Sequence, residues 1–103
     1  MELKQLKYFI SIIESGSIGK AAKKLDVGTS ALSQQISKLE DELSTRLFQR
    51  TAQGVTPTSA GLAFYKQAQL VLRHANFAIE AAQSSRLSGH VSVGMSPSIA
   101  SVL

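Results

Sequence analysis

The chain has 103 residues, of which 44% are hydrophobic, so it can form one domain with a buried core, or one domain with an appendage. It has no cysteine, which excludes a disulfide framework, a thiolate metal site and a cysteine nucleophile. The net charge of +4 is compatible with a nucleic acid or an anionic membrane as partner, but many small soluble domains are mildly basic, so the placement of the charges has to decide.

Residues 2–14 are predicted to form an amphipathic helix, because apolar residues recur there at steps of three and four. These residues are Leu3, Leu6, Phe9, Ile10 and Ile13. Gly16 is predicted to end this helix, and Ser17 to cap a short second helix. The second helix has a buried stripe of Ile18, Ala21, Ala22 and Leu25, and its other side carries Lys20, Lys23 and Lys24.

A third helix is predicted after a break at residues 26–28, where Gly28 can turn the chain and Thr29 or Ser30 can cap the helix. It extends to about Ser44, and its apolar face consists of Leu32, Ile36, Leu39 and Leu43. The other face carries Ser30, Ser33, Gln34, Ser37, Lys38 and Asp41. Its first half is uncharged, and the acids at 40–42 come in the second half. This order suits a helix that inserts its N-terminal end into a DNA groove, because acids there would repel phosphate. The acids at 40–42 are interpreted as a solvated face, with an ion pair between Glu40 and a nearby arginine as the alternative.

Two short extended runs at residues 46–50 and 54–58 predict a small hairpin with its tip at residues 52–54. Such a hairpin is too short to be stable alone, so it must pack on the helices. Three helices, with a tight turn between the second and third, followed by a hairpin, describe a winged helix-turn-helix. We therefore expect a mainly α fold, with this domain at residues 1–58.

Residues 59–88 are predicted to form a linker that is helical from Ser59 to roughly Arg86. This helix is much longer than the usual ~11–12 residues and has a heptad-like apolar seam, so we expect it to pack on another helix along its length. The helical body before it is too short to cover the seam, so a second copy of the chain is the expected partner. The predicted dimer contacts are Leu62, Phe64, Tyr65, Ala68, Val71, Leu72, Ala75, Ala78, Ile79 and Ala82.

Residues 89–103 are expected to begin a further, truncated domain. Ser88 and Gly89 break the helix, and residues 90–95 alternate with period two, which predicts a strand. A lone strand has nothing to pair with, so we expect the chain to be the N-terminal piece of a longer protein. There is no signal-peptide pattern and no apolar run near the ~20 residues that span a bilayer, so a soluble cytoplasmic protein without membrane association is expected.

Several motifs resemble those of the LysR-type transcriptional regulators: AAKKLDV at residues 21–27, ALSQQISKLE at 31–40, LFQR at 47–50 and TSAG at 58–61. The segments LKYF at 6–9 and GSI at 16–18 are similar too, and the resemblance covers residues 1 to about 95. It implies a bacterial transcription regulator whose N-terminal domain binds double-stranded DNA and whose linker helix dimerises it. It also implies a periplasmic-binding-protein-like domain beyond Leu103 that senses a small-molecule effector, and full-length members are commonly tetramers. No cofactor is expected for this part of the chain.

The candidate DNA contacts are Thr29, Ser30, Ser33, Gln34, Lys38, Arg50 and Gln53. Hydroxyl and amide groups at the start of the third helix can bind base edges, and the helix N-terminus favours a phosphate. Thr29 can equally be a cap, whereas Ser33 and Gln34 lie inside the helix and are predicted contacts. Lys38 can reach a phosphate or remain solvated. The resemblance places Arg50 near the DNA backbone, and Gln53 at the hairpin tip can enter the minor groove.

The chain departs from the family pattern at three places. Gln53 stands where an arginine is common, and arginine suits a narrow minor groove better, so a weaker wing contact is expected. Gly28-Thr29 stands where Ser-Gln is frequent, which shifts the expected base contacts onto Ser30, Ser33 and Gln34. Ser44 stands where glycine is usual, so the end of the third helix is expected to cap differently.

Sequence-specific DNA binding by a dimer is the first hypothesis, and two reading helices predict a near-palindromic site. The alternative is a helical module whose long helix docks a partner protein, without DNA. A docking surface should expose apolar anchors, whereas the outer face of the third helix carries serine, glutamine and lysine. An enzyme is not expected, since no nucleophile constellation is present. His74 and His90 have no carboxylate partner at ligand spacing, so they are interpreted as surface or interface residues rather than metal ligands.

Overall fold

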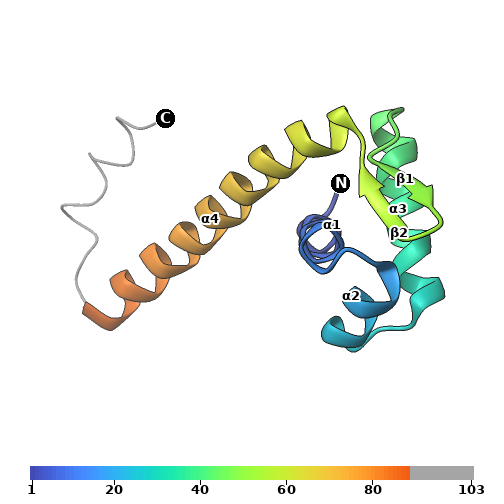
Figure 1. Ribbon diagram of the computed structural model, residues 1–103. Helices are drawn as coiled ribbons and strands as arrows, with labels where there is room; N and C mark the ends of the chain where they lie inside the picture. The colour runs from blue at the N-terminus through green and yellow to red at the C-terminus, as the bar shows by residue number, and fades with distance from the viewer. Residues whose placement is uncertain (89–103) are drawn as a thin grey trace. The chain divides into compact units, whose positions relative to one another are not determined.

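The computed structural model describes residues 1–88, with side chains through residue 85. Its elements are α1 (Leu3–Ser15), α2 (Ile18–Leu25), α3 (Thr29–Leu43), β1 (Phe48–Thr51), β2 (Gly54–Pro57) and α4 (Ser59–Ser88) (Figure 1). The mainly helical winged helix-turn-helix is therefore confirmed. The chain divides into two units, Met1–Leu72 and Arg73–Leu103, so α4 contributes to both. The strand predicted at residues 90–95 and the domain start at 89–103 lie outside the described residues.

The first unit has one core, to which all of its elements contribute. Helices α1, α2 and α3 contact one another, and the core consists of Phe9, Ile12, Ala21, Ala22, Leu32, Ile36, Leu39 and Leu47. The apolar stripes predicted for α2 and α3 all face this core, fully or partly buried. The ring of Phe9 lies 5.2 Å from that of Phe48 and 5.1 Å from that of Phe64, so β1 and α4 close the core around α1.

Helix α1 buries a stripe that is rotated from the predicted one. Leu6, Phe9 and Ile12 are fully buried, although Ile12 was not in the predicted stripe. Leu3, which was in it, is 48% exposed. At 3.6 residues per turn, Leu3 lies roughly 120° around the helix from Phe9, so it points away from the core that Phe9 enters.

The turn from α1 into α2 has the predicted caps. Gly16 ends α1 with φ 80°, in the left-handed region that glycine adopts without steric cost. Ser17 is the N-cap of α2, where its Oγ accepts a hydrogen bond from the backbone N–H of Lys20 at 3.0 Å. This connection fixes the position of α2 relative to α1.

The turn from α2 into α3 differs from the prediction in two respects. Asp26, not Gly28, makes the left-handed turn, with φ 59° and ψ 46°. Aspartate tolerates this conformation better than most residues. Gly28 is instead the N-cap of α3 and provides no side-chain acceptor, so the prediction that Thr29 or Ser30 caps the helix is wrong. Both residues lie inside α3 because the chain enters the helix at Gly28.

The end of α3 is also held differently from the prediction. Ser44 has φ 52° and ψ 38°, the conformation that glycine adopts at such a position, so the expectation of a different cap is wrong. For a residue with a side chain this conformation costs about 1–2 kcal/mol. Glu40 is half-buried rather than solvated, because its Oε2 accepts hydrogen bonds from the backbone N–H groups of Leu47 at 2.7 Å and Phe48 at 3.2 Å. Glu40 thereby attaches the start of β1 to α3.

The hairpin predicted at residues 46–58 is confirmed. Strands β1 and β2 pair antiparallel, with Phe48 opposite Pro57 and Thr51 opposite Gly54, so Ala52 and Gln53 form the tip (Figure 1). The pairing places Arg50 opposite Val55.

Thr58 and Gly61 join the hairpin to α4 and account for the TSAG motif. The Thr58 hydroxyl donates to the carbonyl of Arg46 at 2.7 Å and accepts from the backbone N–H of Gly61 at 3.0 Å. The Thr58 N–H donates to the carbonyl of Leu47 at 2.9 Å. A Cβ on Gly61 would lie 2.1 Å from that same carbonyl oxygen, so only glycine permits this approach. The motif therefore has a structural role, which is to pack the start of α4 against the hairpin.

One face of the first turns of α4 is covered by its own domain. Ala68 is 1% exposed, and Phe64 and Tyr65 pack against the core. The expectation that the preceding domain cannot cover the seam is wrong for this part of α4, and Ala68 is closed to a second chain. The Tyr65 hydroxyl donates to Glu14 Oε2 at 3.0 Å. This hydrogen bond, with burial and the charge of Glu14, raises the pKa of Tyr65 above its usual 10.0, so the phenol keeps its proton at neutral pH.

Candidate nucleic-acid interface

The outer face of α3 presents most of the predicted DNA-contact residues. Thr29, Ser30, Gln34 and Lys38 are exposed, and Ser33 is half-buried. Residues at steps of three and four share a face of a helix, so Ser30, Gln34 and Lys38 form one row along α3. The first turn of α3 contains no acid. Because Gly28 has no side-chain acceptor, the first backbone N–H groups of α3 are free to bind a phosphate.

Arg50 brings the hairpin onto this face. Its guanidinium donates from Nη2 to the Oγ of Ser33 at 3.2 Å, across seventeen residues of sequence. A serine hydroxyl has one proton to donate and two lone pairs, so Ser33 can hold Arg50 and still donate to another group. This hydrogen bond connects two residues that were predicted from the sequence as separate DNA contacts. Ser33 has a positioning role for Arg50 that its place inside a helix did not indicate.

Gln53 does not join this group. It lies exposed at the hairpin tip, where the structure gives its side chain no hydrogen bond. The residues that contact one another are Ser33 and Arg50, and the other predicted contacts are placed by α3 itself. The tip is a separate candidate contact at the end of the hairpin.

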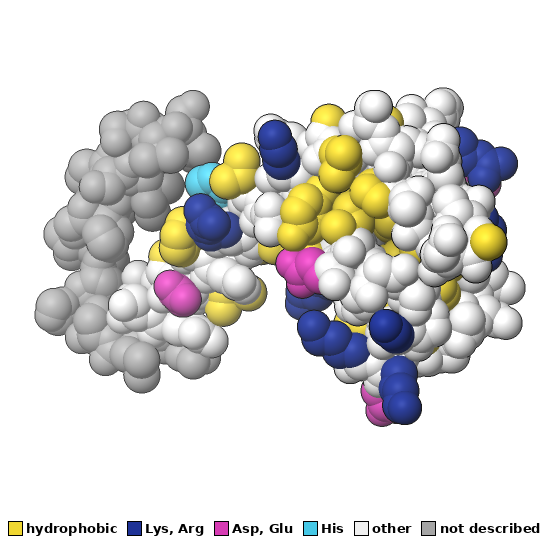
Figure 2. All heavy atoms as spheres, in the orientation of Figure 1, with side chains coloured by type: hydrophobic (Ala, Val, Ile, Leu, Met, Phe, Trp, Pro, Cys, Tyr) yellow, Lys and Arg dark blue, Asp and Glu magenta, His cyan; other side chains and the backbone are white. Residues whose placement is uncertain are grey.

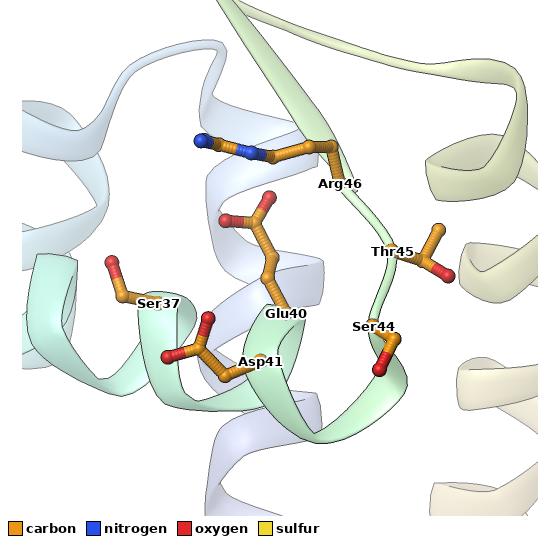
Figure 3. Close-up of a pocket in the computed structure, with 6 residues that line it drawn as sticks. All are labelled: Ser37, Glu40, Asp41, Ser44, Thr45 and Arg46. Carbon is orange, nitrogen blue, oxygen red and sulfur yellow. The ribbon is translucent and has the colours of Figure 1, made fainter.

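A groove runs between α3 and the hairpin. Its polar lining includes Ser33, Ser37, Glu40, Arg46, Gln49 and Arg50. The adjoining pocket at the end of α3 is drawn in Figure 3, where the side chain of Arg46 extends above the Glu40 carboxylate. Arg46 was not among the residues predicted from the sequence to contact DNA. Its signal was its position four residues before Arg50 in the same extended run.

Two other features, a metal cluster and a membrane-spanning helix, are absent from residues 1–88. No group of three or more histidines and acids within residues 1–88 is arranged to hold a metal ion. Within the same residues, no helix is both long and apolar enough to cross a bilayer.

Ser33→Ala is expected to weaken DNA binding mainly through Arg50. If Arg50 contacts a phosphate, removing its side chain should cost about 1.5–3 kcal/mol of binding free energy, because a charged hydrogen bond is lost. If Ser33 acts by orienting Arg50, Ser33→Ala should cost much less when Arg50 is already alanine, with a coupling of about 0.5–3 kcal/mol. Fluorescence anisotropy on the two single variants and the double variant measures this coupling. Additive losses would mean that Ser33 contacts DNA independently.

The chain is similar in sequence to known bacterial regulators. The model of the family "Bacterial regulatory helix-turn-helix protein, lysR family" matches residues 3–62. The nitrogen assimilation regulatory protein nac of Escherichia coli (strain K12) is 43% identical over 102 residues, which are 97% of this chain and 33% of that protein. The transcriptional regulator BudR of Klebsiella aerogenes is 40% identical over 100 residues, covering 95% of this chain and 70% of that protein.

A solved structure shares the fold. The crystal structure of a complex of the CbnR DNA-binding domain with DNA matches with a TM-score of 0.81 and 35% identity, over 84% of this chain and 99% of that one. The chain spans about a third of the length of the nitrogen assimilation protein. The helix-turn-helix and the hairpin described above fall entirely within the region that the family model matches.

Proposed function

The chain belongs to the LysR family of bacterial regulatory helix-turn-helix proteins, and we propose that it binds double-stranded DNA sequence-specifically as a dimer. The observation that carries the proposal is the outer face of α3, whose first half is exposed, uncharged and able to hydrogen-bond, with Arg50 held beside it by Ser33. This arrangement matches a reading helix with a basic backbone contact at its flank.

In the proposed complex the N-terminal half of α3 enters the major groove. Ser30 and Gln34 bind base edges, and a glutamine can bind adenine through two hydrogen bonds. Thr29, together with the free backbone N–H groups of the first turn, lies where a phosphate would bind. Lys38 and Arg50 contact phosphates on either side of the helix, which fixes the register without carrying sequence information. Gln53 makes a weaker minor-groove contact than an arginine would.

The exposed apolar residues of α4 support the proposed dimer. Leu62, Val71 and Ile79 are 51%, 40% and 54% exposed, and Figure 2 shows hydrophobic side chains along the helix. Ala78 and Ala82 are exposed, and Leu72 and Ala75 half-buried. Leu70 and Phe77 of α4 are also large, apolar and exposed, although they were not among the predicted dimer contacts. Burying such residues against a second copy would place two copies of α3 on two half-sites, which calls for a near-palindromic site.

The proposal extends from DNA binding to the activity of the whole protein. The relatives are transcriptional regulators, and the chain covers only a third of one of them, so we infer a bacterial regulator that acts on DNA in the cytoplasm rather than an enzyme. A small-molecule effector and a tetrameric state are expected for the longer protein.

Gln34→Ala tests the proposal. Duplexes selected from a random pool supply the specific probe, and gel shift measures affinity. We expect a loss of about 1–3 kcal/mol on the selected duplex, little change on random duplex and an unchanged sedimentation coefficient. The matched control is Gln67→Ala, which removes an exposed glutamine from α4.

Two outcomes would contradict the proposal. Absence of wild-type binding to any duplex at low salt would do so, because phosphate contacts must produce a salt-dependent affinity. Loss of the dimer by Gln34→Ala with DNA binding intact would instead favour the protein-docking module.

A further inference from the structure

A second arginine lies at the start of the hairpin segment, and we propose that this residue, Arg46, contacts a DNA phosphate outside the set of contacts described above. The inference rests on the proposed function, since it requires α3 to lie in the DNA groove. It concerns a residue that precedes β1 and lines the same groove as Ser33 and Arg50. The contact would add non-specific affinity and no sequence preference.

The charge of Arg46 is not neutralised by a direct pair. Its side chain is exposed, and among residues 1–88 no carboxylate oxygen lies within the 4.0 Å of an ion pair with it. Glu40 is the acid beneath it in Figure 3. The Oε2 of Glu40 already accepts two backbone hydrogen bonds, from Leu47 and Phe48. The guanidinium therefore keeps its donors free for a ligand, and guanidinium donors match phosphate oxygens well.

The backbone that carries Arg46 is fixed on both sides. Its carbonyl accepts from the Thr58 hydroxyl at 2.7 Å. The next residue, Leu47, donates its N–H to Glu40 at 2.7 Å and accepts from the Thr58 N–H at 2.9 Å. A side chain on a fixed backbone has less conformational entropy to lose on binding than one on a flexible loop. Arg46 is therefore well presented for a phosphate contact.

Arg46 and Arg50 are expected to contact different phosphates. They are four residues apart in an extended segment, which places their Cα atoms roughly 13–14 Å apart, and the Arg50 guanidinium is held at Ser33. Asp41 lines the same pocket as Arg46 and reduces its attraction for an anion. A phosphate contact by Arg46 therefore predicts that Asp41→Asn strengthens DNA binding, in the opposite direction to Arg46→Gln.

The salt dependence of binding tests this contact. Each phosphate neutralised contributes about 0.9 to the slope of log Kobs against log salt concentration. Arg46→Gln should lower the slope by about 0.9 and weaken binding by the same factor on the selected duplex and on a random duplex of equal length. Arg46→Lys keeps the charge and should keep the slope. Lys66→Gln, which removes one positive charge from α4, is the matched control and should leave the slope unchanged.

The outcomes separate this inference from the proposed function. If the wild-type chain binds duplex with a salt slope but Arg46→Gln keeps that slope, only the Arg46 contact is overturned. A loss confined to the selected duplex would overturn it too, since it would indicate a base contact. If the wild-type chain does not bind duplex, the proposed function itself fails. Thermal melting of each variant confirms that the fold is retained, and Asp41→Asn provides an independent gain-of-affinity readout.

Discussion

Replacing Gly61 with alanine is expected to disrupt the packing of α4 against the hairpin and to destabilise the fold. The added Cβ would lie 2.1 Å from the carbonyl oxygen of Leu47 and 3.1 Å from its carbon, and both are backbone atoms that cannot rotate away. The start of α4 must therefore move off the hairpin. That movement breaks the hydrogen bonds of Thr58 to Arg46 and Leu47, which lie at 2.7 and 2.9 Å.

The expected cost of Gly61→Ala is about 3 kcal/mol or more, from overpacking and the loss of two or three hydrogen bonds. In a domain of this size it corresponds to a fall in Tm of roughly 10–25 °C. Thermal melting by circular dichroism measures it. Gly19→Ala is the control, because a Cβ there meets only the Oγ of Ser17 at 4.0 Å and alanine favours the helix. Equal melting of the two variants would show that α4 does not dock on Leu47 as described.

The local elements of the domain could be predicted from the sequence because their signals are local. The Gly16-Ser17 pair ends one helix and caps the next, and the structure has both caps. The two short extended runs on either side of residues 52–54 predicted the hairpin, which forms with Ala52 and Gln53 at its tip. Each of these features depends on a few neighbouring residues and on their backbone preferences.

The remaining features could not be predicted because they depend on which surfaces meet. An apolar seam on α4 was evident, but periodicity does not say what covers it, and the domain itself covers Ala68. Glu40 resembled a solvated acid, yet it binds the backbone of a strand that returns past it. The hydrogen bond between Ser33 and Arg50 joins residues from a helix and a hairpin, and no spacing along the chain indicates it. The predicted N-cap of α3 was wrong for a different reason. The actual N-cap, Gly28, has no side chain that would mark it as a cap in the sequence.

Ile79→Asp is expected to convert the proposed dimer to a monomer and thereby to remove most of the affinity for a two-half-site duplex. Ile79 is 54% exposed in the single chain, so the change costs the isolated domain little. In a dimer that buries this residue, the carboxylate would be desolvated and would face its counterpart in the other copy. Linking two reading helices raises affinity by about 10²–10⁴-fold through effective concentration, and this gain is what the variant should lose.

The control for Ile79→Asp is Ser84→Asp, which adds the same charge to an exposed position of α4. At 3.6 residues per turn, Ser84 lies roughly 140° around the helix from Ile79, away from the predicted seam. Sedimentation velocity should show a monomer for Ile79→Asp alone. This variant should also bind one-half-site and two-half-site duplexes with the same weak affinity. If Ser84→Asp dissociates the dimer and Ile79→Asp does not, the contact is made by the other face of α4, where Leu70 and Phe77 are exposed. If neither variant lowers the affinity for the two-half-site duplex, binding to two half-sites does not depend on dimerisation through α4.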